Sequence, residues 1–181
     1  MKKNTILTIC LSLFLAGGLF SQETIYVSAT GAGLNDGTSE ANARGSFGDA
    51  MNDINSEGDK LIIIGTVSTS GAYLTSKSFA FTIEGLDASS TLTGDGGAGR
   101  LFTINGATTA DVTLKDLTFS GINTTLAGGG VLFSNNAGAS ATLENCTFTG
   151  NSVTHNDGGG SIFFANGTLN RRDSSFKNTL S

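Results

Sequence analysis

LFTINGATTADVTLKDLTFSGINTTLAGGG at 101–130 and VLFSNNAGASATLENCTFTGNSVTHNDGGG at 131–160 are consecutive blocks of equal length that end in the same three glycines. A third block, SIFFANGTLNRRDSSFKNTLS, begins at 161 and runs to residue 181. Each block carries short β-type runs separated by turn residues. Repetition with a period of roughly 20 to 30 residues is typical of a solenoid, in which successive turns of the chain stack on one another.

A run that recurs four times predicts which side chains lie above one another in the stack. Its copies are FTIEGL (81–86), VTLKDL (112–117), ATLENC (141–146) and LNRRDS (169–174). Apolar residues alternate in the run, as they do in a strand with one buried face. The expected inward columns are Phe81, Val112, Ala141 and Leu169; Ile83, Leu114 and Leu143; Leu86, Leu117, Cys146 and Ser174; and, just after the run, Phe119, Phe148 and Phe176.

Polar side chains fill the alternate positions, which we expect to face outward. These columns are Thr82, Thr113, Thr142 and Asn170; Thr118, Thr147 and Ser175; and the charged set Glu84, Lys115, Glu144 and Arg172. The charges alternate in sign, which supports the register because opposite charges on neighbouring strands attract. Arg171 conflicts with the pattern, since it falls in the inward column of Leu143, where an unpaired guanidinium is costly. Either the last turn is frayed, or the pattern shifts by one residue and Arg171 is exposed; we expect fraying, with weak order beyond Leu169.

A second strand in each turn is predicted by FTING (102–106), LFSNN (132–136) and FFANG (163–167). Its turn column would be Asn105, Asn135 and Asn166, because stacked asparagines form hydrogen-bonded ladders and tolerate a left-handed backbone. The triple glycines at 128–130 and 158–160 lead into strands and lack the lysine of a phosphate-binding loop. We interpret them as tight corners.

The first 22 residues, MKKNTILTICLSLFLAGGLFSQ, are predicted to be a secretory signal peptide. Two lysines precede an apolar run that is short for a spanning helix, although a retained membrane anchor is the alternative. Without Lys2 and Lys3 the chain has 8 basic and 15 acidic residues, a net charge of −7. This balance argues against binding to nucleic acid or to anionic membranes. Cys146 then remains as the one cysteine, with no intrachain partner for a disulfide, and we interpret it as a packed side chain.

Residues 23–60 are expected to cap the N-terminal end of the coil, which would otherwise present an open edge. The segment contains a strand at Thr24–Ser28, a polar turn at 35–38 and a short helix from Phe47 to about Asn55, capped by Ser46. LIIIG (61–65) would be the first rung, and 61–181 the repeats. The predicted fold is an all-β, right-handed parallel β-helix (solenoid) of about four rungs with an N-terminal strand and helix cap.

The opening IYVSATGAGLNDGTSEANA, the helix and then GDKLIIIGTV resemble the start of secreted right-handed parallel β-helix proteins of the pectin-lyase-like group. GGGVLFSNN, GGGSIFFANG and FTGN (148–151) resemble the repeats of chlamydial-type polymorphic outer-membrane proteins. The resemblance implies a secreted or surface protein, often an adhesin, with the β-helix as the passenger of a larger chain. We expect this chain to be a fragment or a truncated product of such a protein.

Some pectin-lyase-like proteins are polysaccharide lyases or hydrolases, so candidate acids and bases need examination. Hydrolysis needs two carboxylates about 5 Å or about 6.5 to 9.5 Å apart. Asp116 and Asp173 share a corner column with Asn145 between them, which places the two acids roughly 9.6 Å apart. Corner Asp and Asn are usually turn residues. Arg171, Arg172 and Asp173 lack the acidic cluster that a calcium-dependent lyase of this group uses.

Metal and cofactor chemistry receives little support from the sequence. GDGGAGR (94–100) resembles a Gly-Asp calcium turn but occurs once, whereas metal-binding solenoids repeat it. His155 is the single histidine and is interpreted as a solvated loop residue, which excludes ordinary His-based metal sites and catalytic triads. We therefore predict no catalytic, cofactor-binding or metal-binding residue.

The function predicted from the sequence is a secreted or cell-surface, non-catalytic β-helix module for adhesion or structural display, associated with the outer membrane. Its Thr, Ser and Asn ladders would offer a flat hydrogen-bonding surface to a glycan or a host or cell-surface protein. A carbohydrate-active β-helix enzyme or its inactive remnant is the alternative. Self-association through an open C-terminal rung is a third possibility, because an uncovered strand edge can pair with another chain.

Overall fold

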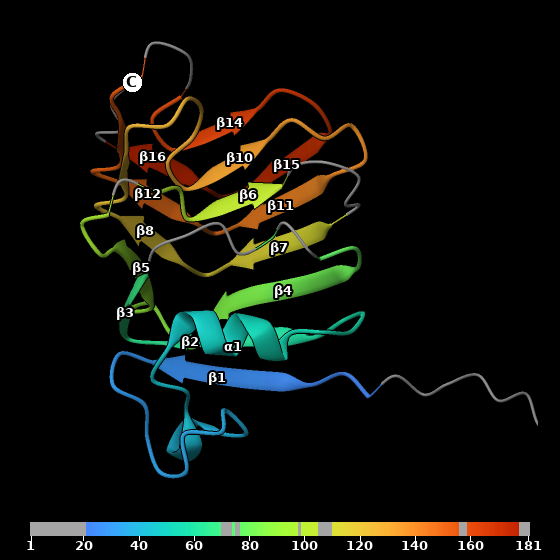
Figure 1. The fold of residues 1–181 in the computed structure, drawn as a ribbon, viewed down its shortest axis with the longest axis vertical. Coiled ribbons are helices and arrows are strands. Elements are labelled where there is room, and N and C mark those ends of the chain that lie inside the picture. The colour runs from blue at the N-terminus through green and yellow to red at the C-terminus, as the bar shows by residue number, and fades with distance from the viewer. Residues whose placement is uncertain are drawn as a thin grey trace, which may run out of the picture.

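The computed structural model describes residues 21–69, 74, 77–97, 99–104, 110–155 and 159–177. Their strands all pair in parallel, and the chain winds as a β-solenoid of about three turns (Figure 1). The first 20 residues of the predicted signal peptide lie outside these ranges, as do Asn105 and Gly158. Within the ranges, no helix is both long enough and apolar enough to cross a membrane.

Three sheets form the sides of the coil. The first sheet contains β1 (Thr24–Ser28), β2 (Lys60–Ile64), β4 (Ala80–Gly85), β7 (Asp111–Lys115), β11 (Ser140–Glu144) and β15 (Thr168–Arg172). The second sheet contains β3 (Thr66–Thr69), β5 (Thr91–Gly94), β8 (Thr118–Ser120), β12 (Thr147–Thr149) and β16 (Ser175–Lys177). The third contains β6 (Phe102–Ile104), β10 (Leu132–Ser134) and β14 (Ile162–Phe164), beside a short pair, β9 (Asn123–Thr124) and β13 (Ser152–Val153). The predicted parallel β-helix is confirmed: three turns have strands in all three sheets, and β15 and β16 begin another.

The inward columns of the recurring run are confirmed by the strand register. Phe81, Val112, Ala141 and Leu169 are aligned, and so are Ile83, Leu114 and Leu143. The rings of Phe119 and Phe148 lie parallel with centroids 4.9 Å apart, and those of Phe148 and Phe176 are 4.6 Å apart. Side chains at equal depth in successive turns therefore form one continuous core.

Leu86 does not belong to the inward column predicted for it. The corners after β7 and β11 have two residues each, whereas five residues, 86–90, separate β4 from β5. Leu86 is therefore 40% exposed in the longer loop, and Ser90 takes the buried position below Leu117. The carbonyl of Ser90 accepts from Thr118 N, as that of Leu117 accepts from Thr147 N.

The expected fraying beyond Leu169 is also wrong. β15 stays in register with β11, which places Arg171 opposite Leu143, and β16 follows as far as Lys177. Arg171 is nevertheless exposed, because β15 is the outermost strand of the first sheet among the described residues, so no described strand lies above it. Its guanidinium lies 5.7 Å from the ring centre of Phe176, so the charge keeps access to water.

The predicted alignment of the second strand is wrong by one residue in its last copy, FFANG (163–167). Ile162, not Phe163, pairs with Leu132, and Phe163 pairs with Phe133. The predicted column of Asn135 and Asn166 is thereby offset, although Asn166 Nδ2 still donates to the carbonyl of Asn135 at 3.2 Å. The glycine corners are confirmed at 128–130: a Cβ on Gly129 would lie 2.5 Å from Phe163 N, closer than real contacts allow.

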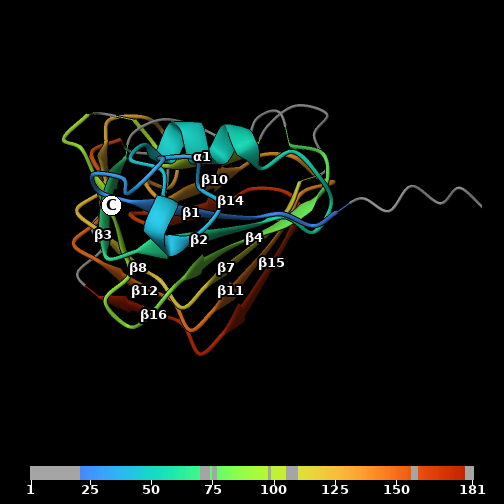
Figure 2. The same cartoon turned by 90° about the horizontal axis from the view of Figure 1, so that it is seen from below.

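The N-terminal cap is a strand and a helix, as predicted. β1 continues the first sheet below β2, so the sheet begins one strand before the expected first rung. Helix α1 (Phe47–Asp53) follows a short 3-10 turn, η1 (Glu40–Asn42), and lies on the side of the third sheet (Figures 1 and 2). Ser46 Oγ caps α1 by accepting from Asp49 N, and the ring of Phe47 lies 6.2 Å from that of Phe102. The helix thus fills the place that a third-sheet strand takes in later turns.

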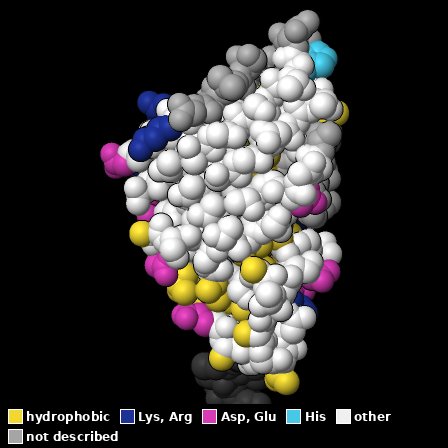
Figure 3. Space-filling view, turned by 90° about the vertical axis from the view of Figure 1, so that its left-hand side faces the viewer, with side chains coloured by type: hydrophobic (Ala, Val, Ile, Leu, Met, Phe, Trp, Pro, Cys, Tyr) yellow, Lys and Arg dark blue, Asp and Glu magenta, His cyan; other side chains and the backbone are white. Residues whose placement is uncertain are grey.

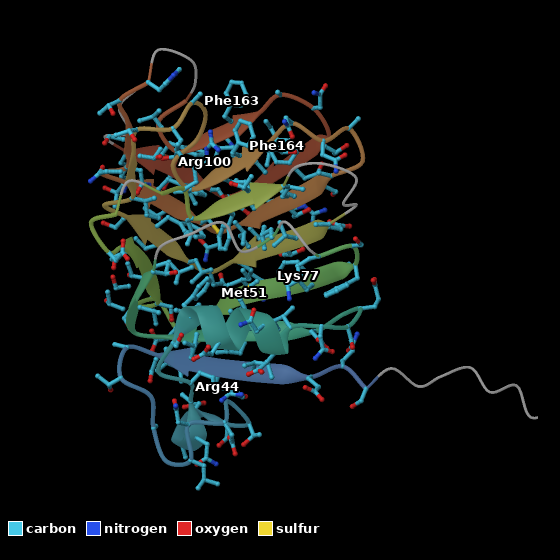
Figure 4. The ribbon with its side chains drawn as sticks, in the orientation of Figure 1. Arg44, Met51, Lys77, Arg100, Phe163 and Phe164 are labelled. Atoms are coloured by element: carbon cyan, nitrogen blue, oxygen red, sulfur yellow. The ribbon has the colours of Figure 1, made fainter. Side chains whose placement is uncertain are left out.

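A buried lysine fixes the other end of this helix. Lys77 is 8% exposed and its ammonium group donates to the carbonyls of Met51 and Ile54 (Figure 4). A cation suits a helix C-terminus, where carbonyl groups lack partners. Burial lowers the pKa of Lys77, although Asp59 and Asp53 oppose that effect. Arg44, in the loop before α1, forms an ion pair at 2.8 Å with Asp53, the last residue of the helix.

Candidate functional site

The outer surface of the second sheet carries two columns of hydroxyl side chains. Register aligns the first residue of each strand in one column and the third residue in the other. We call this surface the hydroxyl face; its members are Thr66, Thr91, Thr118, Thr147 and Ser175 in the first column and Ser68, Thr93, Ser120 and Thr149 in the second. Lys177 ends the second column.

The residue between each pair of hydroxyls holds the face in place. Val67, Leu92, Phe119 and Phe148 are at most 2% exposed and point into the core. Alternation along a strand then turns both flanking residues toward solvent. The members of the face are accordingly half-buried or exposed. The same apolar column that stabilises the coil therefore orients the hydroxyl groups.

Charge is confined to the margins of this surface. Figure 3 shows the side of the molecule that carries the second sheet, with a broad region free of acidic and basic side chains and charges around it. Lys177 is the one charged residue in the two columns. A protein with a net charge of −5 thus presents a neutral polar surface here.

A hollow of about 360 Å³ lies beside the hydroxyl face, at the corner between the first and second sheets. Glu84, Asp87, Asp116, Asn145 and Thr118 contribute to its lining. Asp116 and Asn145, with Asp173 above them, have positive φ angles of 52°, 50° and 48°. Asn145 Nδ2 donates to Asp116 Oδ1 at 2.7 Å. These three residues are turn residues, as predicted.

Glu84, one of the acids in this hollow, is held as a carboxylate by two lysines. Glu84 accepts from Lys115 at 2.7 Å and from Lys60 at 2.8 Å. Burial acts to raise the pKa of Glu84, but the hydrogen bonds from Lys115 and Lys60 outweigh it, and the pKa is lowered. A general acid needs the opposite shift. The charged column predicted from the sequence is confirmed here, and its upper part pairs Glu144 with Arg172 at 3.1 Å.

Other candidate chemical groups lie apart from one another. In the part of the chain that the structure describes, no three His, Cys, Asp or Glu side chains meet as metal ligands. His155 is exposed on a loop, and Asp95 accepts from Gly97 N within its own turn at 2.8 Å. Cys146 is 1% exposed, and burial raises the pKa of its thiol to about 11. A neutral, buried thiol is a poor nucleophile.

The third sheet has an aromatic stack on its outer side. The rings of Phe133 and Phe163 are nearly parallel with centroids 5.6 Å apart, and the guanidinium of Arg100 lies 4.0 Å from the centre of the Phe133 ring (Figure 4). Burial lowers the pKa of Arg100. A Cβ on Gly128 would lie 2.3 Å from the Phe133 ring, so the glycine corner covers one side of the stack. We interpret this stack as support for the corner.

Three of the nine members of the hydroxyl face follow from the sequence columns, since Thr118, Thr147 and Ser175 are in the predicted outward set. The second column and the two early strands, β3 and β5, were missed. Their signal is the pattern hydroxyl, apolar, hydroxyl, which recurs as TVS (66–68), TLT (91–93), TFS (118–120) and TFT (147–149). The spacing between these copies is uneven in the early turns, because their loops differ in length, so the repeat is hard to see in the sequence.

Comparisons of this chain with known proteins found no relative. No family model, no curated protein and no solved structure matches the chain.

Proposed function

We propose that this protein is a secreted or cell-surface, non-catalytic β-helix module for adhesion or structural display, and that its hydroxyl face is the contact surface. The observation that carries the proposal is the two-column array of uncharged hydroxyls on one parallel sheet. Polar groups fixed by strand register can make many hydrogen bonds at small entropic cost, which favours binding. A glycan or a protein of the host or cell surface is the proposed partner.

Three further features agree with this role. The resemblance to pectin-lyase-like β-helices and to polymorphic outer-membrane protein repeats supports a place outside the cell. The predicted signal peptide at 1–22 supports export, and the outer membrane is the proposed location. The lowered pKa of Glu84 and the turn roles of Asp116 and Asp173 argue against acid-base catalysis.

Binding of the full-length chain to immobilised cellulose, chitin, pectin and mucin glycoprotein would test the proposal. We expect binding to at least one of these, and its loss in Thr118→Lys, which puts a charge and a long side chain at the centre of the face. Thr113→Lys is the matched control. Thr113 lies on the same turn, also faces outward, and has a threonine above and below it, but on the first sheet. Equal loss in both variants would refute the hydroxyl face as the contact surface.

The second candidate is a carbohydrate-active enzyme or its remnant, which the acid-lined hollow at the corner favours. Incubation with the same polysaccharides, followed by assays for reducing ends and for unsaturated uronic acids, would detect it. If the parent protein cleaves one of these polysaccharides and Asp116→Asn does not, the enzymatic proposal replaces the adhesion proposal.

A further inference from the structure

We propose that the hydroxyl face binds ice. The proposal rests on the function proposed above, in that it uses the same contact surface, and it names an ordered array of water molecules as the ligand. Neighbouring strands in the sheet are about 4.8 Å apart, and residues two apart in a strand are separated by about 6.6 Å. The surface of an ice crystal is also a regular lattice of water oxygens, so a regular array of hydroxyls a few ångströms apart can contact it at many points.

The extent of the array suits a lattice ligand. Five strands contribute to the first column, so it extends over about 19 Å at the strand spacing of a sheet. Four of the five residues in this column are threonines, and the fifth is Ser175. In the second column serine and threonine alternate from Ser68 to Thr149 before Lys177 ends it. The neutral part of the face therefore repeats regularly in both directions.

Rigidity and charge favour the same ligand. Threonine is β-branched, so its χ1 angle is restricted and its hydroxyl and methyl groups keep their positions along the ladder. The methyl groups order the water next to them, and the hydroxyls hydrogen-bond to that water. Charged side chains would bind mobile hydration shells instead, and the columns have none before Lys177. A neutral, regular and rigid surface complements the neutral surface of ice.

The growth of a single ice crystal in a solution of the full-length chain is the direct test. We expect the parent protein to give faceted crystals and a gap between the melting and the freezing temperature. Thr118→Lys in the first column and Thr93→Lys in the second should abolish both effects, because a lysine holds the surface away from the ice. Thr113→Lys on the first sheet should leave them unchanged. Circular dichroism melts of each variant identify any that fails to fold, and the two hydroxyl-face variants test the face independently.

The outcomes separate this inference from the proposed function. Parent protein that leaves ice crystals round and shows no temperature gap overturns the inference, and so does equal loss in Thr113→Lys. If ice is not bound but Thr118→Lys abolishes binding to a polysaccharide or to mucin, the adhesion role stands and its ligand is that polymer. If Thr118→Lys changes neither assay, both proposals are wrong.

Discussion

Replacing Phe148 by alanine tests whether the aromatic column stabilises the coil. Its ring is fully buried between Phe119 at 4.9 Å and Phe176 at 4.6 Å. Removing a buried phenylalanine costs about 3 to 5 kcal/mol. Each ring pair adds about 0.5 to 1.5 kcal/mol beyond burial. We therefore expect Phe148→Ala to lower the free energy of unfolding by an amount near the upper end of that range.

Phe176 provides the internal comparison, since it ends the same column. It is 38% exposed and stacks on Phe148 alone among the described rings. Burial of part of a phenylalanine side chain stabilises by about 1 to 2 kcal/mol, because full burial contributes about 1.5 to 3 kcal/mol. Phe176→Ala removes less buried area and one ring pair instead of two, so it should cost less than Phe148→Ala.

Equilibrium unfolding of the full-length chain in urea, followed by circular dichroism, measures both losses. Domains of this size are stable by only about 5 to 15 kcal/mol, so Phe148→Ala can leave little folded protein. Phe148→Leu and Phe176→Leu should lose less stability, since exchange between hydrophobic residues of similar volume usually costs less than about 1.5 kcal/mol. The Phe148 variant should still lose more stability than the Phe176 variant. The reasoning is refuted if the Phe176 variants lose as much stability as the Phe148 variants.

Three further predictions concern single side chains. Because the pKa of Glu84 is lowered in the folded protein, its ion pairs stabilise fully above its ordinary pKa of 4.5 and are lost as the pH falls through the folded pKa. Glu84→Gln should thus lower the free energy of unfolding near neutral pH by about 1 kcal/mol or less. Urea unfolding should show that this difference between the variant and the parent protein vanishes in acid. A difference that does not change with pH would contradict the prediction. Cys146 should react with a thiol reagent at pH 8 only as fast as the protein unfolds, so rapid labelling of native protein would disprove its burial. Asn145→Ala should cost about 1 to 2 kcal/mol at its positive φ angle while Asn145→Gly costs less, and thermal melts showing the reverse order would exclude a backbone cause.

The outermost described strands, β15 and β16, show that position in a column does not by itself determine burial. Leu169, Arg171 and Phe176 occupy inward positions by register, yet all three are exposed. An inward side chain is buried only when another turn lies above it. Arginine is acceptable at this end for that reason, whereas in the layer of Leu143 it would lose its water.

The sequence alone determined the parallel coil, the inward columns apart from Leu86, and the three hydroxyls Thr118, Thr147 and Ser175, because every turn must place equivalent side chains at equal depth. Phe119, Phe148 and Phe176 show this directly. Only the tertiary structure decided the rest, because loop length sets where a turn re-enters a sheet. The five-residue loop at 86–90 exposes Leu86 and buries Ser90, and the re-entry of β5 aligns Thr91 and Thr93 with the later hydroxyls. Whether a surface is neutral and regular is therefore a property of the stacked turns together.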